Sequence, residues 1–172
     1  MLYKDFGPCQ DLTKEIKVPE NTDKALIKQE LPIKYFHGSQ PLHHPSYSAK
    51  SRRRIERKYA KDSDFLSKNP IIAVAIIQSD VLLAVHDGHN RLRFVGHLGL
   101  THIPAVIYSV EQVAKASNIP EDDIIRCYKE CVSYAAVSFS QAISNSGKQQ
   151  TMYEPLPMVL WKQLLKDSEP KN

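Results

Sequence analysis

The five consecutive residues Asp87–Arg91, with the sequence Asp-Gly-His-Asn-Arg, carry the side chains best suited to chemistry. An apolar run that ends at Val85 precedes them, and Leu92, Val95 and Leu98 follow at helical spacing. The sequence therefore predicts a buried strand that passes directly into a helix. The backbone N–H groups in the first turn of such a helix lie at the positive end of its dipole and form a ready site for phosphate.

Each residue of this turn has an expected role. Asp87 is expected to cap the helix with its carboxylate, and Gly88 to leave room for an approaching ligand. His89 and Asn90 would bind phosphate through their amides, and the planar guanidinium of Arg91 would bind two phosphate oxygens at once. An ordinary capped turn without a ligand is the alternative interpretation, because short motifs often arise by chance.

Four histidines are candidates for acid–base or substrate contacts. His86 and His89 titrate near neutral pH, so either could act as a general acid or base. His43 and His44 lie in a long loop, 37–50, in which two prolines and a glycine exclude regular structure. The loop could fold over the phosphate site as a substrate loop, in which the two histidines would act as metal ligands or as a catalytic base. A solvated loop without a ligand is the alternative.

A basic helix is predicted to begin near residue 51. Positions 50–61 hold seven basic residues and one acidic residue, a local charge of +6 in a chain whose formal net charge is +4. Arg52, Arg53 and Arg54 could add contacts to phosphate or ribose. The same helix could instead neutralise the phosphates of a nucleic acid, or simply form a charged solvent face.

Hydrophobic periodicity predicts the elements that must position this turn. Strands are expected at 15–18, 31–36, 71–78, 81–85 and 101–108, and helices near 51–66, 92–98, 109–112 and onward, 120–142 and 158–165. The hairpin strands are apolar throughout, which suits burial on both faces. The fold class is α+β, with a small mixed sheet and packed helices over residues 1–117 and a helical C-terminal extension over 118–172 packed on it.

Three local signals refine these elements. Pro104 indicates an edge strand or a strand start, and Ser109 with Gln112 matches a capping box that opens a short helix. Trp161 is expected to anchor the last helix to the body of the protein. The helix at 120–142 carries one apolar stripe, formed by Ile125, Tyr128, Val132, Ala135 and Phe139.

Composition excludes several classes of protein. The chain has 172 residues, and its longest apolar run, Ile71–Ile77, is too short to span a bilayer. Lys4 and Asp5 interrupt the position of a signal peptide, so a cytoplasmic protein without a membrane partner is expected. Three cysteines make neither a disulfide framework nor a four-cysteine zinc site, and no metal site is expected. Cys127 and Cys131 are expected at the edge of the core.

The segment Asn69–Tyr108 resembles the ParB N-terminal domain and sulfiredoxin superfamily, also described as the ParB-like nuclease-type domain. Gly88 and Arg91 match positions that its branches share, and Leu98-Gly99 and Ile103-Pro104 match later landmarks. The resemblance implies a ParB/sulfiredoxin-like core that is clearest over residues 69–108. No cluster of metal-binding carboxylates supports the nuclease activity sometimes attached to such sequences.

The branches differ at two positions of the turn. Sulfiredoxins place a reactive cysteine at the position of His89, and partition-type ParB proteins place Glu and Arg at the positions of His89 and Asn90. The sulfiredoxin reaction and CTP binding are therefore disfavoured. The free serine kinases carry Asp-Gly-His-His-Arg, which is similar to this sequence except at Asn90.

The resemblance to the kinases implies a nucleotide-binding protein that uses ATP or ADP, with Mg²⁺ if catalysis occurs. His89 and Asp87 would then be catalytic, together with a carboxylate from the N-terminal half, for which Glu56 and Glu30 are candidates. The expected activity is phosphotransfer or nucleotide hydrolysis. The alternative is a non-catalytic, DNA-associated ParB-like binding module that uses the basic helix at 50–61.

Overall fold

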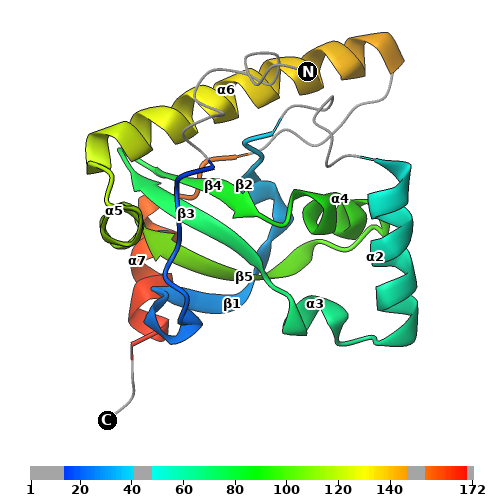
Figure 1. Cartoon of the computed structure of the whole chain (residues 1–172), viewed down its shortest axis with the longest axis horizontal. Coiled ribbons are helices and arrows are strands. Elements are labelled where there is room, and N and C mark those ends of the chain that lie inside the picture. Colours follow the sequence, from blue (N-terminus) through cyan, green and yellow to red (C-terminus); the bar gives the residue numbers. More distant parts are fainter. Residues whose placement is uncertain (1–13, 41–47, 147–153, 170–172) are drawn as a thin grey trace.

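The protein is a five-stranded mixed sheet with helices on both faces, as the computed structural model shows for residues 14–40, 48–146 and 154–169 (Figure 1). The expected α+β class is confirmed. The strand order is β1-β5-β3-β4-β2. The bounds of the strands are β1 (Ile27–Pro32), β2 (Phe36–His37), β3 (Ile71–Ile77), β4 (Val81–Asp87) and β5 (His102–Ser109).

The strand directions decide which loops meet. Strand β4 runs parallel to β2 and antiparallel to β3, whereas β5 runs parallel to β3 and antiparallel to β1. The carboxyl ends of β2 and β4 therefore lie side by side, next to the start of β3. Residues that follow His37 and residues that follow Asp87 emerge at this one end of the sheet.

The predicted hairpin of β3 and β4 is confirmed, and it forms the centre of two cores. Ala73 and Ala75 face one hydrophobic cluster, whereas Val74 and Ile76 face the other. Because successive side chains of a strand point to opposite faces, an all-apolar strand can fill both clusters. Strand β3 is apolar throughout because helices cover the sheet on both of its faces.

Helices cover the two faces of the sheet separately. The helices are α2 (Ala49–Lys61), α3 (Phe65–Lys68), α4 (His89–His97), α5 (Val110–Ser117), α6 (Glu121–Ser146) and α7 (Met158–Asp167), with short 3-10 turns at Thr22–Lys24 and Ile33–Tyr35. Side chains of α3, α4 and α7 join one cluster, and side chains of α5 and α6 join the other. Figure 1 shows α6 along the top of the view and α2, α3 and α4 together at the right.

Two strand predictions in the N-terminal part are wrong. Residues 31–36 do not form one strand, because the chain leaves β1 at Pro32, makes a 3-10 turn and enters β2 at Phe36, on the opposite edge of the sheet. Residues 15–18 are not a strand either. Lys17 bonds through its backbone N–H and carbonyl to the Ser117 hydroxyl at the end of α5, and Ile16 is buried against that face.

Strand β5 is an inner strand, so of the two alternatives that Pro104 indicated, the edge strand is wrong and the strand start agrees with the structure. The proline lies near the start of β5, and the pairing with β3 begins one residue later, where Ala105 meets Ile71. The missing N–H of proline therefore costs no hydrogen bond to β3. The capping box predicted at Ser109 and Gln112 is present and begins α5.

The C-terminal helices bury apolar stripes, but that of α6 is rotated from the predicted one. The residues buried on α6 are Ile124, Cys127, Tyr128, Cys131 and Ala135, so Tyr128 and Ala135 of the predicted stripe are confirmed, while Ile125 and Val132 are only half-buried beside them; the side chain of Phe139 lies outside the described part. The two cysteines act as small apolar residues, as expected. Trp161 anchors α7 with 4% exposure. No helix in the described ranges is long and apolar enough to cross a membrane.

Candidate functional site

The turn between β4 and α4 begins with Gly88 and not with Asp87. Gly88 is the N-cap residue, with a left-handed φ of 107°, and no side chain caps the helix. The expected capping role of Asp87 is therefore wrong: Asp87 ends β4, and its carboxylate accepts a bond from Arg91 instead. The first α-helical bond of α4 runs from the Leu92 N–H to the Gly88 carbonyl at 2.9 Å. Amides before Leu92 must find partners outside the helix.

Gly88 is required by packing, and the expectation that it leaves open space for a ligand is wrong. The residue is buried, and a Cβ atom built on it would lie 2.6 Å from the Ile71 Cγ2 atom. The turn therefore contacts the start of β3 so closely that only glycine fits. This contact fixes where α4 begins.

Arg91 stabilises the same turn through hydrogen bonds to three residues. Its Nη1 atom donates to the carbonyls of Asn69 at 2.6 Å and Pro70 at 3.1 Å, and its Nη2 atom donates to Asp87 Oδ2 at 3.1 Å. The Arg91 side chain is only 16% exposed, whereas that of Asp87 is 65% exposed. A direct contact of this guanidinium with phosphate would require it to leave these partners. In the structure it ties α4 to the start of β3.

His89 is buried against a residue that the sequence analysis missed. Its Nε2 atom accepts the Ser39 backbone N–H at 3.0 Å, and the Ser39 hydroxyl donates to the Val85 carbonyl at 2.7 Å. The Ser39 Oγ atom is also 3.2 Å from Nε2. Because Nε2 accepts a bond, the proton of the neutral His89 ring lies on Nδ1. Ser39 gave no local signal, since its role depends on the parallel pairing of β2 with β4.

The structure brings the start of the predicted substrate loop to the turn. Gly38 and Ser39 lie against His89, as expected for the beginning of this loop. His37 Nε2–H donates to the Glu154 carbonyl at 3.0 Å; burial lowers the pKa of His37, and this bond opposes the effect. His43 and His44 lie outside the described residues.

His86 is separated from the rest of the turn. Its Nδ1 atom is 2.6 Å from the Tyr128 hydroxyl, so it faces α6. Burial lowers the pKa of His86, and the charge of Asp87 partly offsets this shift. Burial also raises the pKa of Tyr128, which keeps its hydroxyl protonated and able to donate to His86. His86 and His89 thus serve different contacts.

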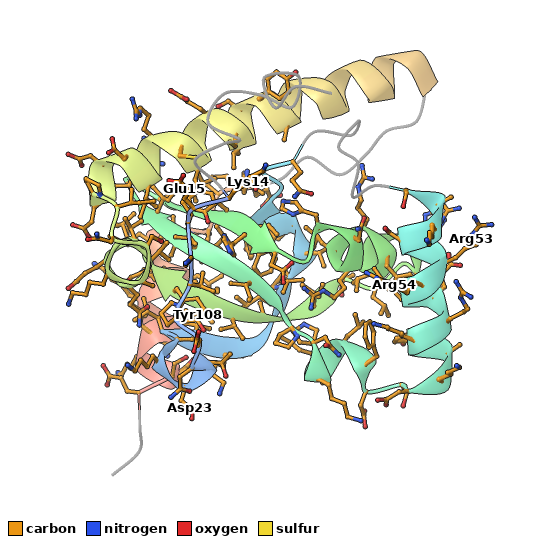
Figure 2. All side chains as sticks on the ribbon, viewed as in Figure 1. Lys14, Glu15, Asp23, Arg53, Arg54 and Tyr108 are labelled. Atoms are coloured by element: carbon orange, nitrogen blue, oxygen red, sulfur yellow. The ribbon has the colours of Figure 1, made fainter. Side chains whose placement is uncertain are left out.

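The basic helix α2 packs beside α4. Tyr59 of α2 contacts Phe94 of α4 edge to face at a centroid distance of 5.4 Å. Glu56 pairs with Arg52 at 3.7 Å, whereas Glu30 lies on β1, at the opposite edge of the sheet from β2. The side chains of Arg53 and Arg54 are exposed, and Figure 2 shows Arg53 pointing outward from α2.

We predict that Gly88→Ala lowers the free energy of unfolding more than Gly99→Ala does. Gly99 also has a positive φ, 77°, but no atom lies within 4 Å of the place that a Cβ atom would take, so alanine there adds about 1 kcal/mol of backbone strain alone. At Gly88 the same strain is joined by the clash with Ile71, for a total of about 2–4 kcal/mol. Urea unfolding followed by circular dichroism measures both effects; equal destabilisation would contradict this packing.

We predict that His86→Gln flattens the pH dependence of stability. The His86 pKa lies below the ordinary 6.5, so as pH falls below about 6.5 the unfolded chain takes up a proton that the folded protein refuses. The His86 contribution to the free energy of unfolding is therefore fully present above that pH. Below it, the free energy of unfolding falls by at most about 1.4 kcal/mol per pH unit. Glutamine keeps a hydrogen-bonding partner for Tyr128 but does not titrate.

Denaturation midpoints between pH 5 and 8 measure this effect. The exposed His97→Gln variant is the control and should keep the wild-type profile. Part of the slope should survive in His86→Gln, because burial lowers the pKa of His37 as well. If the slope of stability against pH is the same in His86→Gln and in the wild type, His86 is not the group responsible.

Comparison with known proteins shows low-level similarity to solved structures. No family model matches the chain, and no curated protein matches it. A solved structure of a Pnob8-like ParB-N domain matches with 13% identity and a TM-score of 0.37, over 83% of this chain. The chain spans 61% of the length of that structure, which carries the name of a ParB-N domain and not of a free serine kinase.

Proposed function

We propose that this protein binds a phosphate-bearing nucleotide at the turn between β4 and α4. The observation that carries the proposal is the position of this turn: α4 begins at the carboxyl ends of two adjacent parallel strands, β2 and β4. Ligands of α/β sheets bind at the carboxyl ends of strands, and a helix N-terminus there attracts anions. The ligand would meet the first turn of α4 and the residues that follow β2.

Main-chain groups supply most of the proposed binding. Arg91 and Asp87 neutralise each other at 3.1 Å, so the positive potential of the turn comes from the amides of His89–Arg91 and the dipole of α4. Asn90, a half-buried polar residue of the first turn of α4, would add a side-chain contact. Basic residues of the neighbouring α2, among them Arg52, would raise the local concentration of an anionic ligand.

ATP or ADP is the proposed nucleotide, as the resemblance to free serine kinases implies. CTP is disfavoured because His89 and Asn90 replace the Glu and Arg of partition-type ParB proteins. Phosphotransfer is the finer form of the proposal, in which Mg²⁺ would neutralise the phosphate oxygens and the turn would position them. Proton transfer by His89 through Nε2 would require Ser39 to release that atom. Glu56 would likewise have to leave Arg52 to act as a catalytic carboxylate.

We predict that a thermal-shift panel of ATP, ADP, CTP and GTP with Mg²⁺ singles out an adenine nucleotide. At a concentration of 100 times the dissociation constant, the ligand should stabilise the protein by about 2.7 kcal/mol. The variant Asn90→Asp should weaken binding at least about tenfold, since its carboxylate repels phosphate. The same carboxylate should preserve the unliganded stability, because an acid in the first turn of a helix is favourable.

The matched control is Asn21→Asp, the same chemical change at the N-cap of the 3-10 helix at Thr22–Lys24. This variant should bind the nucleotide as the wild type does. Absence of a shift with every nucleotide, or equal affinity in Asn90→Asp and the wild type, would refute the proposed site.

The exposure of α2 favours a second candidate function, nucleic-acid binding. All seven of its basic side chains are exposed, and its one acidic residue, Glu56, pairs with Arg52. The basic side chains are Lys50, Arg52, Arg53, Arg54, Arg57, Lys58 and Lys61. Such a surface would bind nucleic acid by neutralising phosphates, without reading the sequence of bases.

We predict that duplex DNA binding, if α2 provides it, weakens when Arg52, Arg53 and Arg54 are changed together to alanine. The slope of log affinity against log salt should decrease by roughly 0.9 for each DNA phosphate that the variant no longer neutralises. Fluorescence anisotropy measures this slope. Exchange of Lys115, Lys162 and Lys166 for alanine removes the same charge from α5 and α7 and is the control. Equal slopes in the two triple variants would exclude α2 as the interface.

A further inference from the structure

Two buried polar residues contact each other at the proposed site. Among the described residues, Ser39 at 6% exposure and His89 at 5% exposure are the polar or charged residues that are buried. Burying a polar group is costly unless it is hydrogen-bonded. The two residues lie fifty positions apart in the chain and satisfy each other's polar groups at one end of the sheet.

The contact joins three segments. Ser39 donates its backbone N–H to His89 Nε2 at 3.0 Å and its hydroxyl hydrogen to the Val85 carbonyl at 2.7 Å. It thereby extends the pairing of β2 with β4 beyond His37, the last residue of β2. His89 is the first residue of α4, so holding its ring also holds the first turn of the helix.

His37, on the other side of Gly38 from Ser39, is also fixed by hydrogen bonds to a neighbouring segment. The Glu154 carbonyl accepts from His37, and the Glu154 N–H donates to the Lys34 carbonyl at 2.9 Å. Leu156 exchanges two backbone bonds with Val81, at the start of β4. The residues on both sides of Gly38 are therefore fixed to neighbouring segments.

We propose that Ser39 is a positioning residue for the phosphate ligand: it holds His89 so that the first-turn amides of α4 point at the ligand. This inference rests on the proposed function. Ser39 would thus raise the affinity for phosphate without contacting the ligand. It also explains why a serine is buried at this position.

A role for Ser39 as a nucleophile is excluded by the same geometry. The 3.2 Å separation of Ser39 Oγ and His89 Nε2 is typical of a nucleophile and its base. Here, however, Nε2 already accepts the Ser39 backbone N–H, and the hydroxyl hydrogen is directed at Val85. The contact therefore supports positioning.

Three variants test the inference. Ser39→Ala keeps the backbone N–H that bonds His89 but removes the hydroxyl bond to Val85 that holds this N–H in place, and Ser39→Thr restores a hydroxyl. Ser117→Ala is the matched control, because its hydroxyl likewise bonds the backbone of a distant segment, at Lys17, but on the face covered by α5. Amide hydrogen exchange of Leu92 reports the opening of the first turn of α4 without any ligand.

In Ser39→Ala we expect Leu92 to exchange about tenfold faster and the dissociation constant of the nucleotide to rise about tenfold, as for the loss of one buried hydrogen bond. Ser39→Thr should restore both values, and Ser117→Ala should change neither. Nitrogen-15 NMR of the wild type should show the His89 ring protonated at Nδ1, which tests the contact without any variant. Protonation at Nε2 instead, or unchanged exchange in Ser39→Ala, would overturn the inference.

These measurements distinguish a failure of the proposed nucleotide binding from a failure of the positioning role of Ser39. A wild type that binds no nucleotide refutes the proposed function and, with it, the phosphate role of Ser39. A wild type that binds nucleotide, together with unchanged affinity in a Ser39→Ala variant of faster exchange, overturns only the positioning role.

Discussion

The close approach of Gly88 to Ile71 is the constraint on which the candidate site depends. The backbone at the end of β4 passes so near to the start of β3 that a single added carbon would overlap Ile71. Because glycine alone fits, and adopts the left-handed conformation there, α4 must leave the sheet at one angle. Arg91 reinforces this angle by bonding Asn69 and Pro70, the residues that lead into β3. The position of the first turn is thus a property of the sheet and not of a mobile loop.

The contacts of Arg91 leave the main chain of the first turn as the part that would recognise a phosphate. A guanidinium in the motif indicated a side-chain clamp, but Arg91 is occupied by main-chain carbonyls and by Asp87. Recognition would instead depend on amides and the helix dipole, which are pre-oriented because Ser39 and His89 hold the turn from the opposite side. Such groups belong to the folded helix and are ordered before binding, which favours affinity. They discriminate little between nucleobases, so base specificity would come from other residues.

Local patterns in the sequence predicted much of the fold. The hairpin of β3 and β4, the capping box at Ser109, the basic helix and the anchoring of Trp161 all depend on residues close together in the chain. Contacts between distant segments were not predictable in this way. The split of residues 31–36 between β1 and β2, and the burial of Ser39 against His89, arise only once the strand order is known.

The candidate site was predicted in place but not in detail. The turn does join β4 to α4, yet one left-handed glycine moved the cap from Asp87 to Gly88. On α6 the buried face includes Ile124, Cys127 and Cys131, which the spacing of the larger apolar residues did not indicate. His86 and His89 are close in sequence, but a strand side chain and a helix side chain point to different neighbours, Tyr128 and Ser39.

The most direct test of the central claim is a titration of the nitrogen-15-labelled protein with ADP and Mg²⁺, followed by amide chemical shifts. If the first turn of α4 binds phosphate through its main chain, the largest shifts should fall on the amides of His89, Asn90 and Arg91 and saturate with one dissociation constant. Shifts confined to the basic side of α2, or no saturable shift at these three amides, would contradict the account.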